Sequence, residues 1–248
     1  MPDAWILSDL HLETLVARRL ALDPPAAFDL LVLAGDVREG DVRACVEAAA
    51  RLAAGRPALL ALGNHDLWGL DLDAATAEAA ALGRDLGVHV MDGTPVEVLG
   101  LRVCGGTLWD NVGPRAAGAP RPDLTRIMTG AEPDFAAPPQ FAPYGEPVRV
   151  ASGNGTRRAT FADIARRRAA TLAAIAAAEP DLVVTHYPPD ADCLARAPGA
   201  AAWVHGHVHG HDRRLEGGTE VILNARQSRV FAERMVVRVE PRAPAPVP

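Results

Sequence analysis

The sequence contains no lysine, so arginine supplies all 25 of its positive charges, and the formal net charge is −6. The arginines are scattered except in the short runs Arg157–Arg158 and Arg166–Arg168. Proteins that bind extended nucleic acid usually carry a continuous basic patch or stripe, which this chain lacks. We therefore do not expect it to bind extended duplex nucleic acid.

Cysteine is also scarce. The chain has three cysteines, Cys45, Cys104 and Cys193. Their number is odd, and their spacing matches neither a metal-binding nor a redox motif. This argues against a cysteine-type structural zinc site and favours a reducing compartment. We expect the three residues to be small side chains of the core.

The N-terminal segment 1–8 lacks the basic region of a signal peptide, and its apolar run is too short to span a membrane. We expect a cytoplasmic protein without a membrane partner. With 49% hydrophobic and 23% charged residues, the composition is that of a globular protein. We expect one domain over residues 1–240 and a tail rich in proline and alanine over 241–248.

Short apolar runs at 4–7, 30–34 and 58–62 each end in polar residues, which is typical of strands buried on both faces of a sheet. The alanine-rich stretches 42–54 and 74–86 between and after them favour helices. This alternation predicts parallel strands with right-handed crossovers. In such sheets ligands bind beyond the carboxyl ends of the strands, where the polar residues fall.

The second half of the chain begins with an irregular excursion over residues 111–156, rich in proline, glycine and alanine. Segments of this length are usually lids, binding loops or poorly ordered surface loops. The apolar pattern around the excursion predicts one helix, over 161–175 and ending before Pro180. The strands predicted around it fall at 96–108 (two runs), 182–185, 201–204, 220–223 and 235–239, the last two as a closing antiparallel piece.

Five clusters of polar residues follow predicted strands. They contain carboxylate, amide and imidazole groups but no thiolate, a set that suits Mn²⁺, Fe or Zn²⁺. The clusters are Asp9-Leu10-His11, Gly35-Asp36, Gly63-Asn64-His65-Asp66, His186 and Gly206-His207-Val208-His209. Residues two apart in an extended segment point the same way, so Asp9 with His11, or His207 with His209, can address one metal centre.

Taken in order, these clusters resemble the motifs of the calcineurin-like metallophosphoesterase superfamily. The resemblance implies a four-layer α/β/β/α sandwich with two metal ions, manganese being favoured and iron or zinc being alternatives. It implies that Asp9, His11 and His209 hold one ion and that Asn64, His186 and His207 hold the other. Asp36 would bridge the two ions and partly offset their repulsion.

The resemblance also implies the mechanism: a metal-activated hydroxide attacks phosphorus, and no covalent enzyme intermediate forms. His65 would be the catalytic histidine that stabilises the transition state or protonates the leaving oxygen. Asp66 could accept a hydrogen bond from His65 and raise its basicity. The alternative for Asp66 is a helix N-cap before Leu67.

The motifs of this chain depart from those of two subfamilies, and this narrows the range of expected substrates. Val37-Arg38-Glu39-Gly40 replaces the Asp-Arg-Gly element of protein serine/threonine phosphatases, and Gly-Asn-His-Asp differs from the Gly-Asn-Arg-Asp of lipid-sugar pyrophosphatases. We expect hydrolysis of a small phosphoester, either a phosphodiester or a phosphomonoester, with nucleotides among the candidates. A non-catalytic interaction scaffold of the same fold and a nuclease are the alternatives.

Other residues near the clusters have open roles. Trp68 and Trp109 could stack on a substrate ring or anchor the core. His205 and His211 flank the last cluster and could tune it, although structural roles are favoured.

Overall fold

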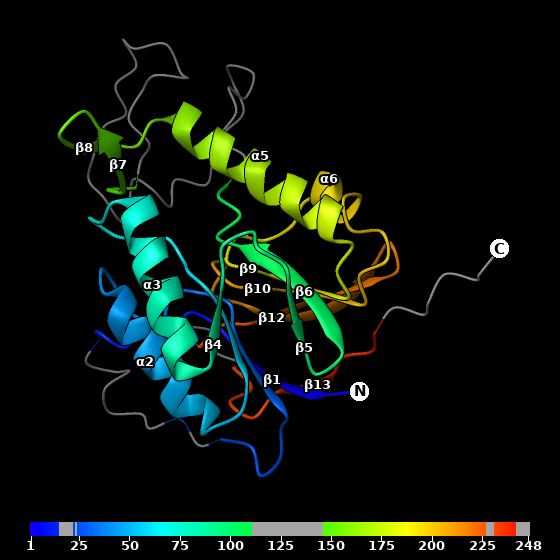
Figure 1. Ribbon diagram of the computed structural model, residues 1–248. Helices are drawn as coiled ribbons and strands as arrows, with labels where there is room; N and C mark the ends of the chain where they lie inside the picture. Colours follow the sequence, from blue (N-terminus) through cyan, green and yellow to red (C-terminus); the bar gives the residue numbers. More distant parts are fainter. Residues whose placement is uncertain (15–21, 23, 111–145, 227–230, 242–248) are drawn as a thin grey trace.

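Two mixed sheets form the centre of the computed structural model, which describes residues 1–14, 22, 24–110, 146–226 and 231–241 (Figure 1). The first sheet has the order β13-β1-β2-β3-β4, in which β1 to β4 are parallel and β13 is antiparallel to β1. Its strands are β1 (Asp3–Leu7), β2 (Leu30–Leu33), β3 (Ala58–Ala61), β4 (Val88–Met91) and β13 (Val236–Arg238).

The second sheet has the order β11-β12-β10-β9-β6-β5. Its four central strands are parallel, and β11 and β5 are antiparallel edge strands. Its strands are β5 (Val96–Val98), β6 (Leu101–Gly106), β9 (Leu182–Thr185), β10 (Ala202–His205), β11 (His211–Glu216) and β12 (Thr219–Asn224).

Helices cover the outer face of each sheet. They are α2 (Val42–Ala53) and α3 (Leu72–Leu86) on the first sheet, and α5 (Phe161–Ala178) and α6 (Ala191–Leu194) on the second. Side chains at helix starts fix their boundaries: Asp41 and Asp71 accept backbone N–H groups at the N-termini of α2 and α3. Thr160 and Asp163 form a capping box at the start of α5.

Alternation along the strands produces three apolar layers. Trp5 of β1 packs in the core shared with α2 and α3, whereas its neighbour Ile6 packs in the core between the two sheets. In β9, Val184 faces the other sheet, and Val183 packs in the core shared with α5 and α6. The predicted four-layer α/β/β/α sandwich is therefore confirmed.

The edges of the sheets differ from the prediction. Strand β12 pairs in parallel with β10, and β13 joins the other sheet, so they do not form one closing antiparallel piece. The antiparallel partner of β12 is β11, whose residues are mostly exposed. Hydrophobic periodicity misses such a strand because neither of its faces is apolar.

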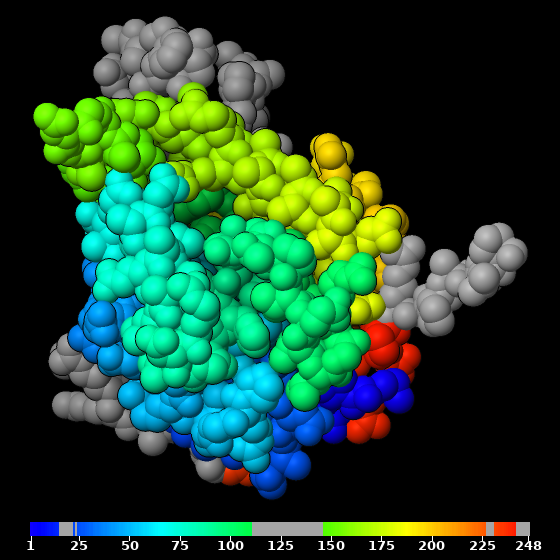
Figure 2. Space-filling model, viewed as in Figure 1, coloured from blue at the N-terminus to red at the C-terminus, as the bar shows by residue number. Residues whose placement is uncertain are grey.

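Most of the predicted excursion, residues 111–145, lies outside the described residues, as do residues 242–248 of the predicted tail. The described end of the excursion is not irregular, because β7 (Arg149–Ser152) and β8 (Gly155–Arg158) form an antiparallel hairpin. In the space-filling view this hairpin lies beside α3 and the start of α5 (Figure 2). Among the described residues, no helix combines the length and apolarity that crossing a membrane requires.

Close contact between β6 and β9 generates a first prediction. A Cβ atom added to Gly105 would lie 1.8 Å from the carbonyl oxygen of Val184, which is backbone and cannot turn away. We expect Gly105→Ala to lower the free energy of unfolding by about 3 kcal/mol, the upper end for overpacking. Gly155→Ala is the control, because nothing lies within 4 Å of its added Cβ. Equal urea-unfolding curves for the two variants would contradict this account.

Candidate metal centre

All seven residues predicted to bind metal lie in loops that directly follow parallel strands. The carboxyl ends of these strands meet at one edge of the two sheets. Asp9 and His11 follow β1, Asp36 follows β2, Asn64 follows β3, His186 follows β9, and His207 and His209 follow β10. Strands from both sheets thus supply side chains to a single place.

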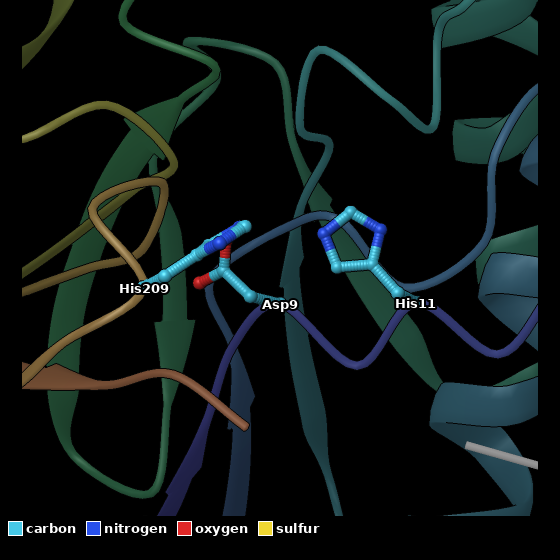
Figure 3. Close-up of side chains that lie close together, drawn as sticks. All are labelled: Asp9, His11 and His209. Carbon is cyan, nitrogen blue, oxygen red and sulfur yellow. The ribbon is translucent and has the colours of Figure 1, made fainter. Parts of the chain in front are cut away.

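Asp9, His11 and His209 form one group, whose potential ligand atoms all lie within 4.8 Å of one another. His209 Nε2 lies 3.5 Å from Asp9 Oδ1. Figure 3 shows Asp9 and His11 on the loop after β1 and His209 on the loop that faces it. His11 Nε2 is buried without a hydrogen-bond partner. A buried polar atom of this kind fits a bound cation, because burial without a partner is otherwise costly.

A second group surrounds Asn64. Its Oδ1 lies 2.9 Å from His186 Nε2 and 3.2 Å from His207 Nδ1. The other ring nitrogen of His186 lies 2.9 Å from the carbonyl oxygen of Ala34, which can only accept a hydrogen bond. His186 Nδ1 therefore carries a proton. Burial opposes charge on the ring, but Asp36 outweighs burial and raises the pKa of His186 to about 9, so a metal ion would have to displace the second proton from Nε2, the nitrogen that points to Asn64.

Asp36 lies between the two groups. Its Oδ2 lies 3.7 Å from His11 Nε2, and its Oδ1 lies 3.4 Å from His186 Nε2. Asp36 also shares a potential metal site with Asp9 and His186. One carboxylate thus reaches both groups, which is the geometry that a bridging ligand requires.

Burial and mutual charge set the protonation of the centre. Burial raises the pKa of Asp9 to about 6. Burial opposes ionisation of Asp36 too, but the charge of His186 outweighs it and holds the pKa of Asp36 below its ordinary value. Burial lowers the pKa of His207 to about 3. The His207 ring is therefore neutral at neutral pH, which is the form that binds metal ions.

Five of the predicted ligands have left-handed backbone conformations, with φ between 43° and 71°. They are Asp9, His11, Asp36, His207 and His209. Asp9 and His11 share one group, as expected for a pair two residues apart. The expected extended conformation is wrong, however, because the chain turns sharply where each strand ends, and His207 and His209 do not share a group. His207 joins Asn64 and His186, whereas His209 joins Asp9. Strained backbone of this kind is concentrated at functional sites.

Asp66 has neither of its expected partners. It receives no hydrogen bond from His65, and it caps no helix, because α3 begins only at Leu72 behind its own cap. Its carboxylate accepts backbone N–H groups from two loops, at distances of 2.7 to 2.9 Å. The donors are Asp36, Val37, Arg38 and Gly63. Asp66 therefore ties the loop after β2 to the loop after β3.

Two glutamates that the sequence reasoning missed contact the histidines instead. Glu39 Oε2 lies 3.0 Å from His65 Nδ1, and Glu13 Oε1 lies 3.0 Å from His11 Nδ1. The other oxygen of Glu13 accepts the backbone N–H of Glu39 at 3.1 Å. Glu13 lies two residues after His11, and Glu39 lies three residues after Asp36. This closeness in sequence to a predicted ligand is the signal that could have identified them.

Aromatic rings pack against two of the histidines. Trp68 stacks on His65 with ring centroids 4.9 Å apart and planes 21° apart. Tyr187 lies 4.1 Å from His207, ring to ring. Trp109 is buried and packs on Tyr187. Of its two possible roles, this position agrees with anchoring the core.

The flanking histidines lie outside the two ligand groups. His205 is buried, and burial lowers its pKa to about 4. His211 lies at the exposed start of β11, with Nδ1 3.1 Å from Asn224 Oδ1. Both positions agree with the structural roles that the sequence favoured. The three cysteines are free and buried, as expected.

Comparisons with known proteins identify the family of the chain and a structure with a similar fold. The family model described as calcineurin-like phosphoesterase matches residues 3–211. The phosphopantetheinyl hydrolase of Mycobacterium tuberculosis has a similar fold, with a TM-score of 0.63 and 18% identity over 98% of both chains. A dimetal phosphatase from Danio rerio matches with a TM-score of 0.41 and 12% identity, over 89% of this chain and 86% of its own. No curated protein sequence gives a significant match.

The contacts of Asp66 generate a second prediction. Asp66→Ala leaves four N–H groups without their acceptor, each costing about 1–3 kcal/mol if it stays buried and unpaired. Because some of these groups will rebond to water, we expect a loss of at least about 3 kcal/mol of unfolding free energy, measured in urea. Asp66→Asn, which keeps one acceptor oxygen, should lose less. The exposed Asp85→Ala is the control, and an Asp66→Ala variant as stable as this control would refute the assigned role.

Proposed function

The chain belongs to the calcineurin-like phosphoesterase family, and we propose that it hydrolyses a small phosphoester at the centre formed by Asp9, Asp36 and Asn64 with their histidines. Members of this family are metal-dependent phosphoesterases, and this chain is one of them. The observation that carries the proposal is the position of Asp36 between two groups of potential ligands. A complete set of ligand residues favours catalysis over a scaffold role.

We assign one metal ion to Asp9, His11 and His209 and the other to Asn64, His186 and His207, with Asp36 shared by both. The buried, unpartnered Nε2 of His11 and the convergence of ring nitrogens on Asn64 Oδ1 support this division. Oxygen and imidazole donors favour manganese, with iron or zinc as alternatives. Two bound ions would draw in the phosphoryl oxygens and lower the pKa of water at the site towards neutrality.

His65 is the proposed catalytic histidine. Its backbone N–H donates to Asp36 Oδ1 at 2.9 Å, which holds the residue beside the shared carboxylate. Glu39 Oε2 accepts a hydrogen bond from His65 Nδ1–H, which leaves Nε2 as the atom that exchanges a proton with the leaving oxygen. Trp68 stacks on the ring and restricts its rotation. We propose that Asp66 acts through the loops it ties together and not by contact with the substrate.

The proposed substrates are small phosphodiesters and phosphomonoesters, including nucleotides. The similar structure is a phosphopantetheinyl hydrolase, so phosphopantetheinyl esters belong in the same screen. Free, buried cysteines fit the reducing conditions of the cytoplasm, which is the compartment we propose.

Replacing the shared carboxylate tests the metal assignment. We expect Mn²⁺-stimulated hydrolysis of bis-p-nitrophenyl phosphate or p-nitrophenyl phosphate by the wild type. Removing a group that only hydrogen-bonds to a metal ligand typically lowers activity roughly 10–100-fold. Asp36→Ala should lose more than this, because both ions lose a ligand. Metal content, measured by elemental analysis after gel filtration, should fall in parallel. Full activity in Asp36→Ala would refute the bridging role.

Replacing His65 separates catalysis from metal binding. We expect His65→Ala to slow turnover by about 10²–10⁴-fold, the usual contribution of a positioned acid or base, with nearly unchanged metal content. Glu39→Gln should reduce turnover less, because its contact orients the His65 ring and a glutamine oxygen can still accept the hydrogen bond. A His65→Ala variant that loses its metal would show that His65 is a ligand instead.

A further inference from the structure

We propose that Glu13 is a positioning residue that orients both His11, an assigned metal ligand, and His65, the assigned catalytic histidine. This inference rests on the proposed function, because it concerns two residues of the same centre. Glu13 belongs to none of the five clusters of the sequence analysis and to neither group of potential metal ligands. It acts through other residues and does not touch the substrate.

The first contact of Glu13 orients His11. The N–H of Thr14 donates to the carbonyl oxygen of His11 at 3.0 Å, and this turn lets Glu13 reach back to the ring. Glu13 Oε1 lies 3.0 Å from His11 Nδ1. A carboxylate only accepts hydrogen bonds, so Nδ1 donates and Nε2 is left facing Asp36 Oδ2, 3.7 Å away. A carboxylate bonded to the second nitrogen of a ligand histidine holds the ring in place for the metal.

The second contact of Glu13 reaches the loop after β2. Its other oxygen, Oε2, accepts the backbone N–H of Glu39 at 3.1 Å. The side chain of Glu39 continues to His65, with Oε2 of Glu39 3.0 Å from Nδ1 of the ring. Holding the backbone of Glu39 therefore holds the point from which its carboxylate reaches His65. The two oxygens of Glu13 thus serve one histidine each.

These contacts complete a closed circuit that begins and ends at the shared carboxylate. Asp36 Oδ1 accepts the N–H of His65 at 2.9 Å, and Asp36 Oδ2 faces His11. The imidazole rings of His11 and His65 lie edge to face, with centroids 4.9 Å apart. The circuit runs through Asp36, His65, Glu39, Glu13 and His11. A change at Glu13 therefore reaches a metal ligand in one direction and the catalytic histidine in the other.

The backbone of the same loops is held by hydrogen bonds that do not involve Glu13. The N–H of Leu12 donates to the carbonyl oxygen of Val37 at 2.9 Å. The N–H of Gly40 donates to the carbonyl oxygen of His65 at 2.8 Å. The side chain of Glu13 is itself partly exposed to solvent. Replacing Glu13 should therefore leave the loops folded and release mainly the side chains that it orients.

Two substitutions test this role. Glu13→Ala removes both acceptor oxygens. Glu13→Gln keeps the shape of the side chain but only one acceptor, because its amide nitrogen is a donor and cannot pair with the second N–H group. Glu13→Gln should therefore lose at least one of the two effects expected of Glu13→Ala. Glu97→Ala and Glu97→Gln are the matched controls, because Glu97 is an exposed residue of the edge strand β5 that pairs with Arg102.

The first measurement is the affinity for Mn²⁺, by calorimetry on protein freed of metal with a chelator, and it does not depend on turnover. Loss of the hydrogen-bond partner of a ligand histidine typically lowers metal affinity roughly 10–100-fold. We expect Glu13→Ala to bind Mn²⁺ at least about tenfold more weakly than the wild type. The two Glu97 variants should keep the wild-type affinity. An unchanged affinity in Glu13→Ala would overturn the role of Glu13 at His11.

The second measurement is kcat and KM for bis-p-nitrophenyl phosphate at saturating Mn²⁺, with and without His65. We expect Glu13→Ala to lower kcat about tenfold and to leave KM nearly unchanged, because Glu13 positions His65 without touching the substrate. In a His65→Ala background the same substitution should lower kcat less than about twofold, because the residue that it positions is gone. An equal loss of kcat in both backgrounds would overturn the link to His65.

The two proposals fail in different ways. A wild-type protein without any hydrolysis that depends on Asp36 would refute the proposed function, and the Mn²⁺ affinities would still test the contact between Glu13 and His11. A wild-type protein that hydrolyses the diester, with kcat and Mn²⁺ affinity insensitive to both Glu13 substitutions, would refute only the role assigned to Glu13. If Glu13→Ala does not fold, Glu13→Gln decides the question, because its side chain has nearly the wild-type shape.

Discussion

The buried carboxylate of Asp66 holds together the two loops on which the rest of the centre depends. It accepts N–H groups from the loop after β2, which carries Asp36, and from the loop after β3, which carries Asn64 and His65. Asp36 in turn accepts the N–H of His65. Burial and the charge of Asp36 raise the pKa of Asp66 to about 6, although its backbone donors oppose this shift. Hydrogen bonds to the backbone thus place the chemical groups before any ligand is bound.

The sandwich explains why residues far apart in the sequence meet. Each sheet supplies parallel strands whose carboxyl ends lie at the same edge, and an apolar layer between the sheets fixes their separation. His186 reaches across to the carbonyl oxygen of Ala34, and the N–H of His207 reaches Asp9. The first sheet supplies the two carboxylates, the amide and one imidazole, and the second supplies the other three imidazoles. Neither sheet alone contains a complete set of ligands.

The sequence predicted what depends on local patterns, and it missed what depends on contacts between loops. Buried strands such as β9 stand out as apolar runs followed by a polar residue, so their existence and the donors at their ends could be read directly. The hydrogen-bond partner of His65 could not be predicted in this way. Glu39 lies in a different loop, and Asp66, which is nearer in sequence, accepts backbone N–H groups instead.

Five residues of the centre have a left-handed backbone conformation that lowers stability, at positions where the chemistry needs their side chains: Asp9, His11, Asp36, His207 and His209. Glycine adopts this conformation freely. For other residues it costs roughly 1–2 kcal/mol of folding free energy each, and somewhat less for asparagine and aspartate. A chain selected only for stability would place glycine at these five positions, but glycine offers no ligand atom. The residues that give the protein its chemistry are therefore among those that fold least favourably, and ion binding is the process that can recover this free energy.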